Sequence, residues 1–303
     1  MSLHSPLAEK LFNTSAIGGL RRVVFELLKE HKAAGEDGLP TSARFLFYEL
    51  VQRGVLKKHD EVAPRTDGKK GRRPDQNLHD ALTDLREAGL VPWDWIVDET
   101  RSLEDRTGWP SIMNWATTSV KYARLDPWRG RRPLILTESR SLAGALRKLA
   151  IQYATKLAAT NGQVGGFLHT VVAPQLNPGD TVLYCGDWDW QGHQIEDNTR
   201  RVLERLVGDL DWTRVTLTEE QVDDYDLRPL QIMKIDNRYK PDDPRYLYPA
   251  VETEALKQQV IVQIVRDALD AELPEPLEDV MPPRDRGLHP SSPHASSLWI
   301  TCG

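Results

Sequence analysis

Short apolar segments alternate with amphipathic segments in the second half of the chain, and this alternation limits the fold more than any other feature. The apolar segments have the length of strands, and the amphipathic segments repeat their apolar residues every three or four positions, as helices do. The expected strands are residues 133–138, 181–187 and 213–218, and the expected helices are residues 139–157, 191–207 and 248–273. Strands separated by helices predict an α/β domain with a parallel sheet.

The first part of the chain has a different pattern. Three amphipathic helices and then a segment that alternates like a strand are expected at residues 18–35, 39–54, 78–90 and 91–101. Thr41 or Ser42 is a suitable N-cap for the second helix, and Gly54 is a suitable end. This order is typical of a winged helix-turn-helix domain, whose last helix often enters a DNA groove. A purely structural helical domain fits the same pattern, so DNA binding is left open here.

These patterns divide the 303 residues into five parts. We expect an N-terminal extension (1–18), a winged-helix domain (19–110), a connector (111–133), an α/β domain (134–273) and a tail (274–303). The tail is rich in Pro, Ser and His, a composition typical of disorder. Residues 1–133 carry a formal charge of +3 and the remainder −9, so basic character is concentrated in the first part.

Several classes of protein are disfavoured by composition. No run of 18 apolar residues occurs, which argues against a membrane-spanning helix. The first residues lack a charged segment followed by an apolar one, so no secretory signal is expected. The two cysteines, Cys185 and Cys302, lie in an apolar strand and in the tail, which fits neither a disulfide framework nor a zinc cluster. We expect a cytoplasmic protein without a membrane partner.

Carboxylates follow two of the predicted strands. Glu138 ends the first strand, Asp187 ends the second, and Asp189 comes two residues later. Ligands of parallel α/β sheets bind at the carboxyl ends of the strands, where these three acids could converge. Closely packed carboxylates repel one another, and Mg²⁺ or Mn²⁺ would remove that conflict. The alternative is that one aspartate caps the next helix and the other is solvated.

This set of acids resembles the Toprim domain of topoisomerases, bacterial primases and some nucleases. The segment GDWDWQGHQI is most similar to the GDPDPHG-type motif of the topoisomerase VI A subunit and its meiotic double-strand-break relative. The matching residues are Gly186, Asp187, Asp189, Gly192 and Ile195, while Trp188 and Trp190 stand where that family has prolines. The resemblance implies a Rossmann-like Toprim fold in which Glu138, Asp187 and Asp189 bind Mg²⁺ or Mn²⁺.

The same family places a winged helix with a nucleophilic tyrosine before the Toprim domain. In ARFLFYELV, Arg44 and Tyr48 have the spacing of the family motif, although Phe45 replaces its aspartate. The resemblance therefore implies Tyr48 as the nucleophile, Arg44 as its companion, and a homodimer in which each metal site serves the partner's tyrosine. A buried core aromatic is the alternative reading of Tyr48.

Further similarity extends to segments of bacterial topoisomerase VI A-like proteins from mobile or defence loci. The similar segments are residues 85–101, 231–240 and 250–256, which contain Lys234, Asp236, Arg238, Glu252 and Glu254. Lys234 and Arg238 could reach phosphates, although a surface salt-bridge turn is the plainer interpretation of Arg238.

Two basic clusters are candidates for contacts with DNA phosphates. The first contains Arg65, Lys69, Lys70, Arg72 and Arg73, and the second contains Arg124, Arg129, Arg131 and Arg132. A solvated loop without a partner is the alternative for each cluster.

Together these features predict a Mg²⁺-dependent enzyme that binds and cleaves double-stranded DNA by tyrosine attack on the phosphodiester. A hydrolytic Toprim nuclease with a structural Tyr48, and a non-catalytic DNA-binding component, are the alternatives. No GHKL-type ATPase motif occurs, so strand passage would need a separate ATPase subunit.

Overall fold

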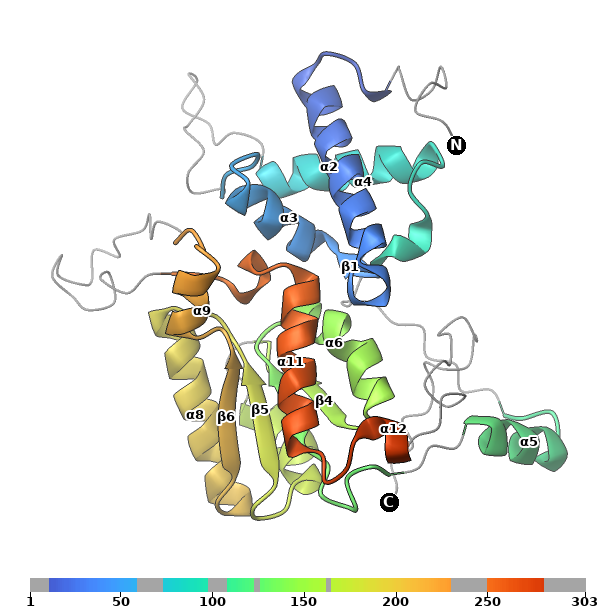
Figure 1. Ribbon diagram of the computed structural model, residues 1–303, viewed down its shortest axis with the longest axis vertical. Helices are drawn as coiled ribbons and strands as arrows, with labels where there is room; N and C mark the ends of the chain where they lie inside the picture. Colours follow the sequence, from blue (N-terminus) through green and yellow to red (C-terminus); the bar gives the residue numbers. More distant parts are fainter. Residues whose placement is uncertain are drawn as a thin grey trace, which may run out of the picture.

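The computed structural model describes residues 11–58, 73–97, 108–122, 126–161, 165–229 and 250–280. Within these residues a helical unit lies over one end of an α/β unit, and the fold is mixed α/β (Figure 1). None of the helices in these ranges is long and apolar enough to cross a membrane.

The helical unit contains three helices, α2 (Ala16–Ala33), α3 (Ala43–Gln52) and α4 (Pro74–Glu87), with a short 3₁₀ turn η1 (Gly35–Asp37) between the first two. Ser42 caps α3 by accepting a hydrogen bond from the amide of Phe45, as its sequence position predicts. Gly54, just beyond α3, has a φ of 70°, which glycine adopts readily. Apolar residues one helical turn apart meet in a common core, which includes Val24, Leu27, Leu28, Leu46, Leu50, Leu78, Leu82 and Leu85.

A short strand pair completes the helical unit. Strand β1 (Thr41–Ser42) runs parallel to β2 (Ile96–Val97), which follows the 3₁₀ turn η3 (Trp93–Trp95). The strand-like pattern of residues 91–101 therefore corresponds to a turn and two strand residues within the described part of the chain.

The α/β unit is built on a parallel sheet, as the alternating pattern predicts. Strands β3 (Leu134–Thr137), β4 (Lys156–Ala159), β5 (Thr181–Cys185) and β6 (Asp211–Thr216) have the spatial order β4-β3-β5-β6. In the central pair Thr137 lies opposite Cys185, so β3 and β5 end at the same level. The residues that follow these two strands are therefore neighbours at the carboxyl edge of the sheet.

Helices cover both faces of the sheet, because the strands are apolar on both sides. Helices α6 (Arg140–Gln152) and α11 (Gln258–Glu272) share a core with Ile135 and Leu183 on one face. Helix α8 (Trp190–Val207) and the π-helical turn η4 (Leu168–Val172) pack against Leu136 and Tyr184 on the other face. The smaller elements are α7 (Gly165–Phe167), η5 (Ala173–Gln175), α9 (Glu219–Asp224), η6 (Thr253–Ala255) and α12 (Leu277–Val280).

Two predicted helices differ from the structure. The helix expected over residues 139–157 ends at Gln152, and a turn through Ala154, whose φ is 49°, leads into strand β4. The closing helix expected from residue 248 begins at Gln258, because Val251 pairs with Trp188 in a β-bridge before the helix starts. Both differences arise from contacts that are distant in sequence.

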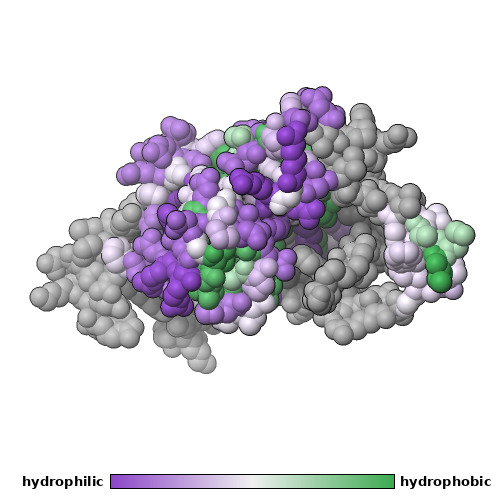
Figure 2. Space-filling model, turned by 90° about the horizontal axis from the view of Figure 1, so that it is seen from below, coloured by the Kyte–Doolittle hydropathy of each residue, from purple (hydrophilic) through white to green (hydrophobic). Residues whose placement is uncertain are grey.

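The predicted connector also contains a helix, α5 (Ile112–Tyr122). It projects from the side of the α/β unit and displays apolar side chains (Figures 1 and 2). Ile112, Met113 and Trp115 are 84%, 73% and 51% exposed.

Candidate functional site

The turn after β5 is fixed on three sides. The amide of Gly186 donates to the carbonyl of Thr216 over 2.7 Å, and the carbonyl of Gly186 accepts from the amide of Leu217 over 2.9 Å. A Cβ at Gly186 would lie 2.6 Å from the ring of buried Tyr184, so only glycine fits. Arg214 donates to the Gly186 carbonyl and forms a 2.7 Å ion pair with Glu196. These contacts define the position of the next residue, Asp187.

Trp188 connects this turn to a distant segment. Its amide donates to the carbonyl of Val251 over 2.8 Å, and the amide of Val251 donates back over 3.0 Å. The indole packs edge-on against His193 and lies beneath the guanidinium of Arg214. This bridge places the residues after Val251, including Glu252 and Glu254, beside Asp187.

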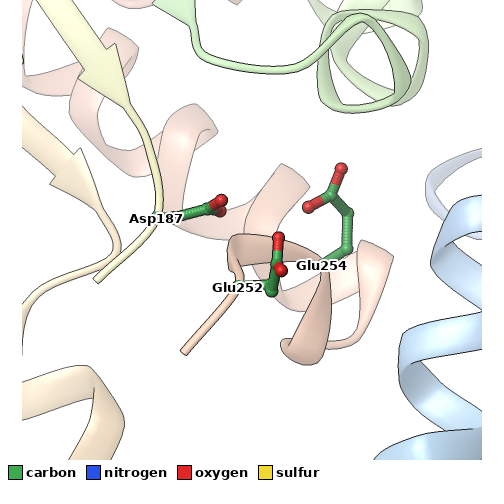
Figure 3. Close-up of side chains that lie close together, drawn as sticks. All are labelled: Asp187, Glu252 and Glu254. Carbon is green, nitrogen blue, oxygen red and sulfur yellow. The ribbon is translucent and has the colours of Figure 1, made fainter. Parts of the chain in front are cut away.

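Three carboxylates gather at this point. One oxygen from each of Asp187, Glu252 and Glu254 lies within 4.8 Å of the others, and the side chains face a common space (Figure 3). Asp187 is held by the amide and the hydroxyl of Thr253, at 2.8 and 3.1 Å. Glu254 is 1% exposed, and its Oε2 has no hydrogen-bond partner within the described residues. An all-oxygen set with a buried unpaired acceptor fits a hard divalent cation.

The other two predicted metal ligands lie around this cluster. Glu138 Oε2 accepts a 3.2 Å hydrogen bond from the amide of Asp187. Asp189 Oδ1 accepts a 2.6 Å hydrogen bond from the amide of Gly192, so Asp189 is the N-cap of α8. The structure therefore brings Asp187 together with Glu252 and Glu254, with Glu138 next to them and Asp189 capping a helix.

Helix α3 presents Arg44 and Tyr48, one turn apart, to the same cluster. Arg44 donates from Nε to Glu254 over 2.7 Å and from Nη2 to Glu252 over 2.8 Å. Lys58 Nζ donates to the other oxygen of Glu252 over 2.6 Å. The Tyr48 ring lies close to both cations, with its centroid 5.2 Å from the Arg44 guanidinium and 5.3 Å from Lys58 Nζ. Glu252 thus joins Arg44 and Lys58 of the helical unit to the acidic cluster.

The pKa values of Asp187 and Glu138 are both raised. Burial, together with repulsion from Glu252, Glu254 and Glu138, raises the pKa of Asp187 well above its usual range. Burial also raises the pKa of Glu138, although the amide of Asp187 opposes this shift.

The pKa values of Glu252 and Tyr48 are shifted in opposite directions. Burial alone would raise the pKa of Glu252, but Lys58 and Arg44 outweigh it and hold this pKa below its ordinary value. Glu252 is therefore an ionised acceptor. Burial and the neighbouring Glu252 raise the pKa of Tyr48 well above that of a free phenol.

A groove of about 870 Å³ runs past Tyr48 between the two units. Its lining is rich in cationic side chains, which are Arg44, Lys58, Arg73, Arg86 and Arg140, together with His79. Asp75 is the acidic residue of this lining, and it pairs with Arg73 over 2.6 Å. Such a basic groove suits a polyanion.

The predicted DNA contacts separate into three groups. Arg73 lines the groove, whereas Arg129, Arg131 and Arg132 are exposed just before β3, at the opposite edge of the sheet from the acidic cluster. Arg129 pairs with Glu275. Arg132 pairs with Asp126 over 3.1 Å. The remaining predicted contacts lie outside the described residues, and they are Arg65, Lys69, Lys70, Arg72, Arg124 and Lys234.

Two components of the site were not assigned a role from the sequence. Glu252 and Glu254 were identified only by their resemblance to a family segment, and Lys58 was not identified. The pair of glutamates two residues apart before a helix is a local signal that could have pointed to ligands. Lys58 has no such signal, because its role depends on the packing of α3 against η6.

The site thus combines clustered carboxylates, a tyrosine flanked by two cations and a basic groove. Comparison with known proteins found no matching family model and no significant similarity to a curated protein or to a solved structure.

Proposed function

We propose that the chain binds double-stranded DNA in the basic groove and cleaves it at the junction of the two units, in the manner of a topoisomerase VI A subunit. One observation carries this proposal. Tyr48 comes from the helical unit and the acidic cluster from the α/β unit, and Arg44 and Lys58, which both lie against the Tyr48 ring, both form ion pairs with Glu252. A nucleophile within reach of both a base and a cation site is the arrangement that phosphoryl transfer requires.

Asp187, Glu252 and Glu254, with Glu138 adjacent, are the residues that would hold a divalent cation, Mg²⁺ or Mn²⁺. Such a cation supplies positive charge beside the phosphate oxygens. The protein's own groups provide the remaining chemistry. The groove cations neutralise neighbouring phosphates and hold the backbone against Tyr48.

In the proposed step the Oη–P bond forms as the P–O3′ bond breaks. The phenol proton passes to the neighbouring carboxylate of Glu252, which is ionised because Lys58 and Arg44 hold its pKa below the ordinary value. The 3′-oxygen leaves and takes a proton from water, and the 5′ end remains attached to Tyr48. Arg44 and Lys58, both close to the ring, favour the developing phenolate charge.

Hydrolytic cleavage is the second candidate, and the burial of Tyr48 favours it. The side chain is only 8% exposed, and its raised pKa disfavours the phenolate in the metal-free chain. In this alternative water attacks the phosphate, and Tyr48 has the structural role of positioning the Glu252 side chain.

A single assay separates these functions. Supercoiled plasmid is incubated with the protein and Mg²⁺ or Mn²⁺, stopped with SDS, and examined for cleavage and for protein bound to 5′ ends. The proposal predicts covalent ends that disappear in Tyr48→Phe and in Asp187→Asn. Cleavage that survives Tyr48→Phe but not Asp187→Asn indicates hydrolysis. Binding of DNA without cleavage under either metal indicates a non-catalytic component. A homodimer and a separate ATPase subunit remain predictions.

A further inference from the structure

Protein cations occupy both oxygens of Glu252. Lys58 Nζ lies 2.6 Å from Oε1, and Arg44 Nη2 lies 2.8 Å from Oε2. Glu252 is also one of the three carboxylates that could hold a metal ion. Two positive charges at the same carboxylate oxygen repel each other strongly in a half-buried site. A divalent cation therefore competes with a cation that the chain already supplies.

The two protein cations are not equivalent. Arg44 is on helix α3 and makes a second ion pair, to Glu254, so it is held at two points. Lys58 lies four residues beyond Gly54, outside the helix, and its side chain is 28% exposed. A lysine ammonium is a point charge on a flexible stem, whereas a guanidinium is a rigid fork. Lys58 is the cation that can leave Glu252 more easily.

A second position is available to the Lys58 ammonium group. Its side chain lines the basic groove together with Arg73 and Arg140. After leaving Glu252, the ammonium group would lie within the groove where we place the phosphates of DNA.

We propose that Lys58 is an exchangeable counter-ion of the acidic site. In the metal-free chain Lys58 neutralises Glu252. When a metal ion binds, the ammonium group leaves Glu252 Oε1 and contacts a DNA phosphate in the groove. This inference rests on the metal site of the proposed function. Metal binding and DNA binding are then cooperative. The metal binds Glu252 and a DNA phosphate binds Lys58, and these two residues pair with each other in the free chain.

The test is the affinity of the full chain for Mn²⁺ without DNA, measured by calorimetry or by the EPR signal of free Mn²⁺. Lys58→Met keeps the apolar stem and removes the competing charge, so the Kd for Mn²⁺ should fall by about tenfold. Lys57→Met is the matched control, because Lys57 is exposed next to Lys58 and its substitution changes the net charge equally. An equal effect of the two substitutions would show general electrostatics and overturn the inference.

The outcomes also separate this inference from the proposed function. Absence of Mn²⁺ binding in both the wild type and Lys58→Met overturns the metal site, and the counter-ion role with it. Wild-type binding that Lys58→Met leaves unchanged or weakens overturns the counter-ion role alone.

The groove contact is tested with a short DNA duplex by fluorescence anisotropy. With Ca²⁺ present, Lys58→Met should weaken duplex binding about tenfold relative to Lys57→Met, because one phosphate contact is lost. Without a divalent cation the two variants should bind equally. A loss that is the same with and without Ca²⁺ contradicts the exchange.

Discussion

At the scale of single residues, Arg214 positions the acidic turn without belonging to it. Its guanidinium donates to the carbonyl oxygens of Gly186 and Leu217 and pairs with Glu196, and both side chains of the pair are 13% exposed. Arg214→Met should lower the free energy of unfolding by about 3 kcal/mol, because Glu196 would be left with an uncompensated charge. Urea unfolding checks this value. Arg200→Met, which breaks an exposed pair with Glu204, should change stability by about 0.5 kcal/mol or less.

A similar loss of unfolding free energy in Arg214→Met and Arg200→Met would show that the Arg214 ion pair contributes no more than an exposed pair. A small loss in both would show that the turn after β5 holds its shape without Arg214.

Glu49 makes stability depend on pH at the residue scale. Burial would raise its pKa, but hydrogen bonds and attraction from His31 and Arg53 prevail and lower it. A carboxyl with a lowered folded-state pKa adds stability above its unfolded pKa of about 4.3, and this contribution disappears as the pH falls through the folded value. The stability difference between wild type and Glu49→Gln, from urea unfolding at pH 6, 5, 4 and 3.5, should shrink on acidification. A constant difference contradicts this role.

At the scale of elements, the end of β5 requires a glycine. Gly186→Ala would push a methyl group against the Tyr184 ring, at 2.6 Å, in a fully buried environment. We expect a loss of about 1–3 kcal/mol in unfolding free energy and weaker Mn²⁺ binding. Gly19→Ala in α2 is the control, since nothing lies within 4 Å of its new Cβ, and it should stabilise by up to about 1 kcal/mol. Normal stability and metal affinity in Gly186→Ala would contradict the close packing.

The sequence patterns predicted elements more reliably than contacts between them. The strong alternation around β3, β5 and β6 marked a parallel sheet, which the structure confirms. Strand β4, with the sequence KLAA, lacks β-branched residues, and the predicted helix ran into its first two residues. The acids after β3 and β5 were predicted to be neighbours, and Glu138 does accept a hydrogen bond from Asp187.

The remaining acids of the cluster could not be located from local patterns. Glu252 and Glu254 reach Asp187 through the backbone bridge between Trp188 and Val251, which joins two segments that are far apart in the sequence. Trp188, which stands where the similar motif has a proline, has an amide N–H and donates it to this bridge. A proline at this position could not donate that hydrogen bond.

At the scale of the whole molecule, one chain brings its own tyrosine to its own acidic cluster. The family resemblance implies instead that the tyrosine acts at the partner's metal site. The test mixes the Tyr48→Phe and Asp187→Asn variants. If tyrosine and acids of one chain act together, every site lacks either the tyrosine or Asp187, so DNA cleavage should not recover. Light scattering after gel filtration gives the oligomeric state of the mixture. Recovery of cleavage in mixed dimers would show that the tyrosine acts across the dimer.

If Tyr48 and the acidic cluster form one cleavage site, the covalent bond between protein and DNA must be on Tyr48. A reaction with DNA and Mg²⁺ or Mn²⁺ is stopped with SDS, digested with nuclease and protease, and analysed by mass spectrometry for nucleotide adducts. A nucleotide joined through its 5′-phosphate to Tyr48 is expected, and it should be absent without a divalent cation and absent in Asp187→Asn. Cleaved DNA without an adduct on Tyr48, or an adduct on the exposed Tyr225, would contradict this expectation.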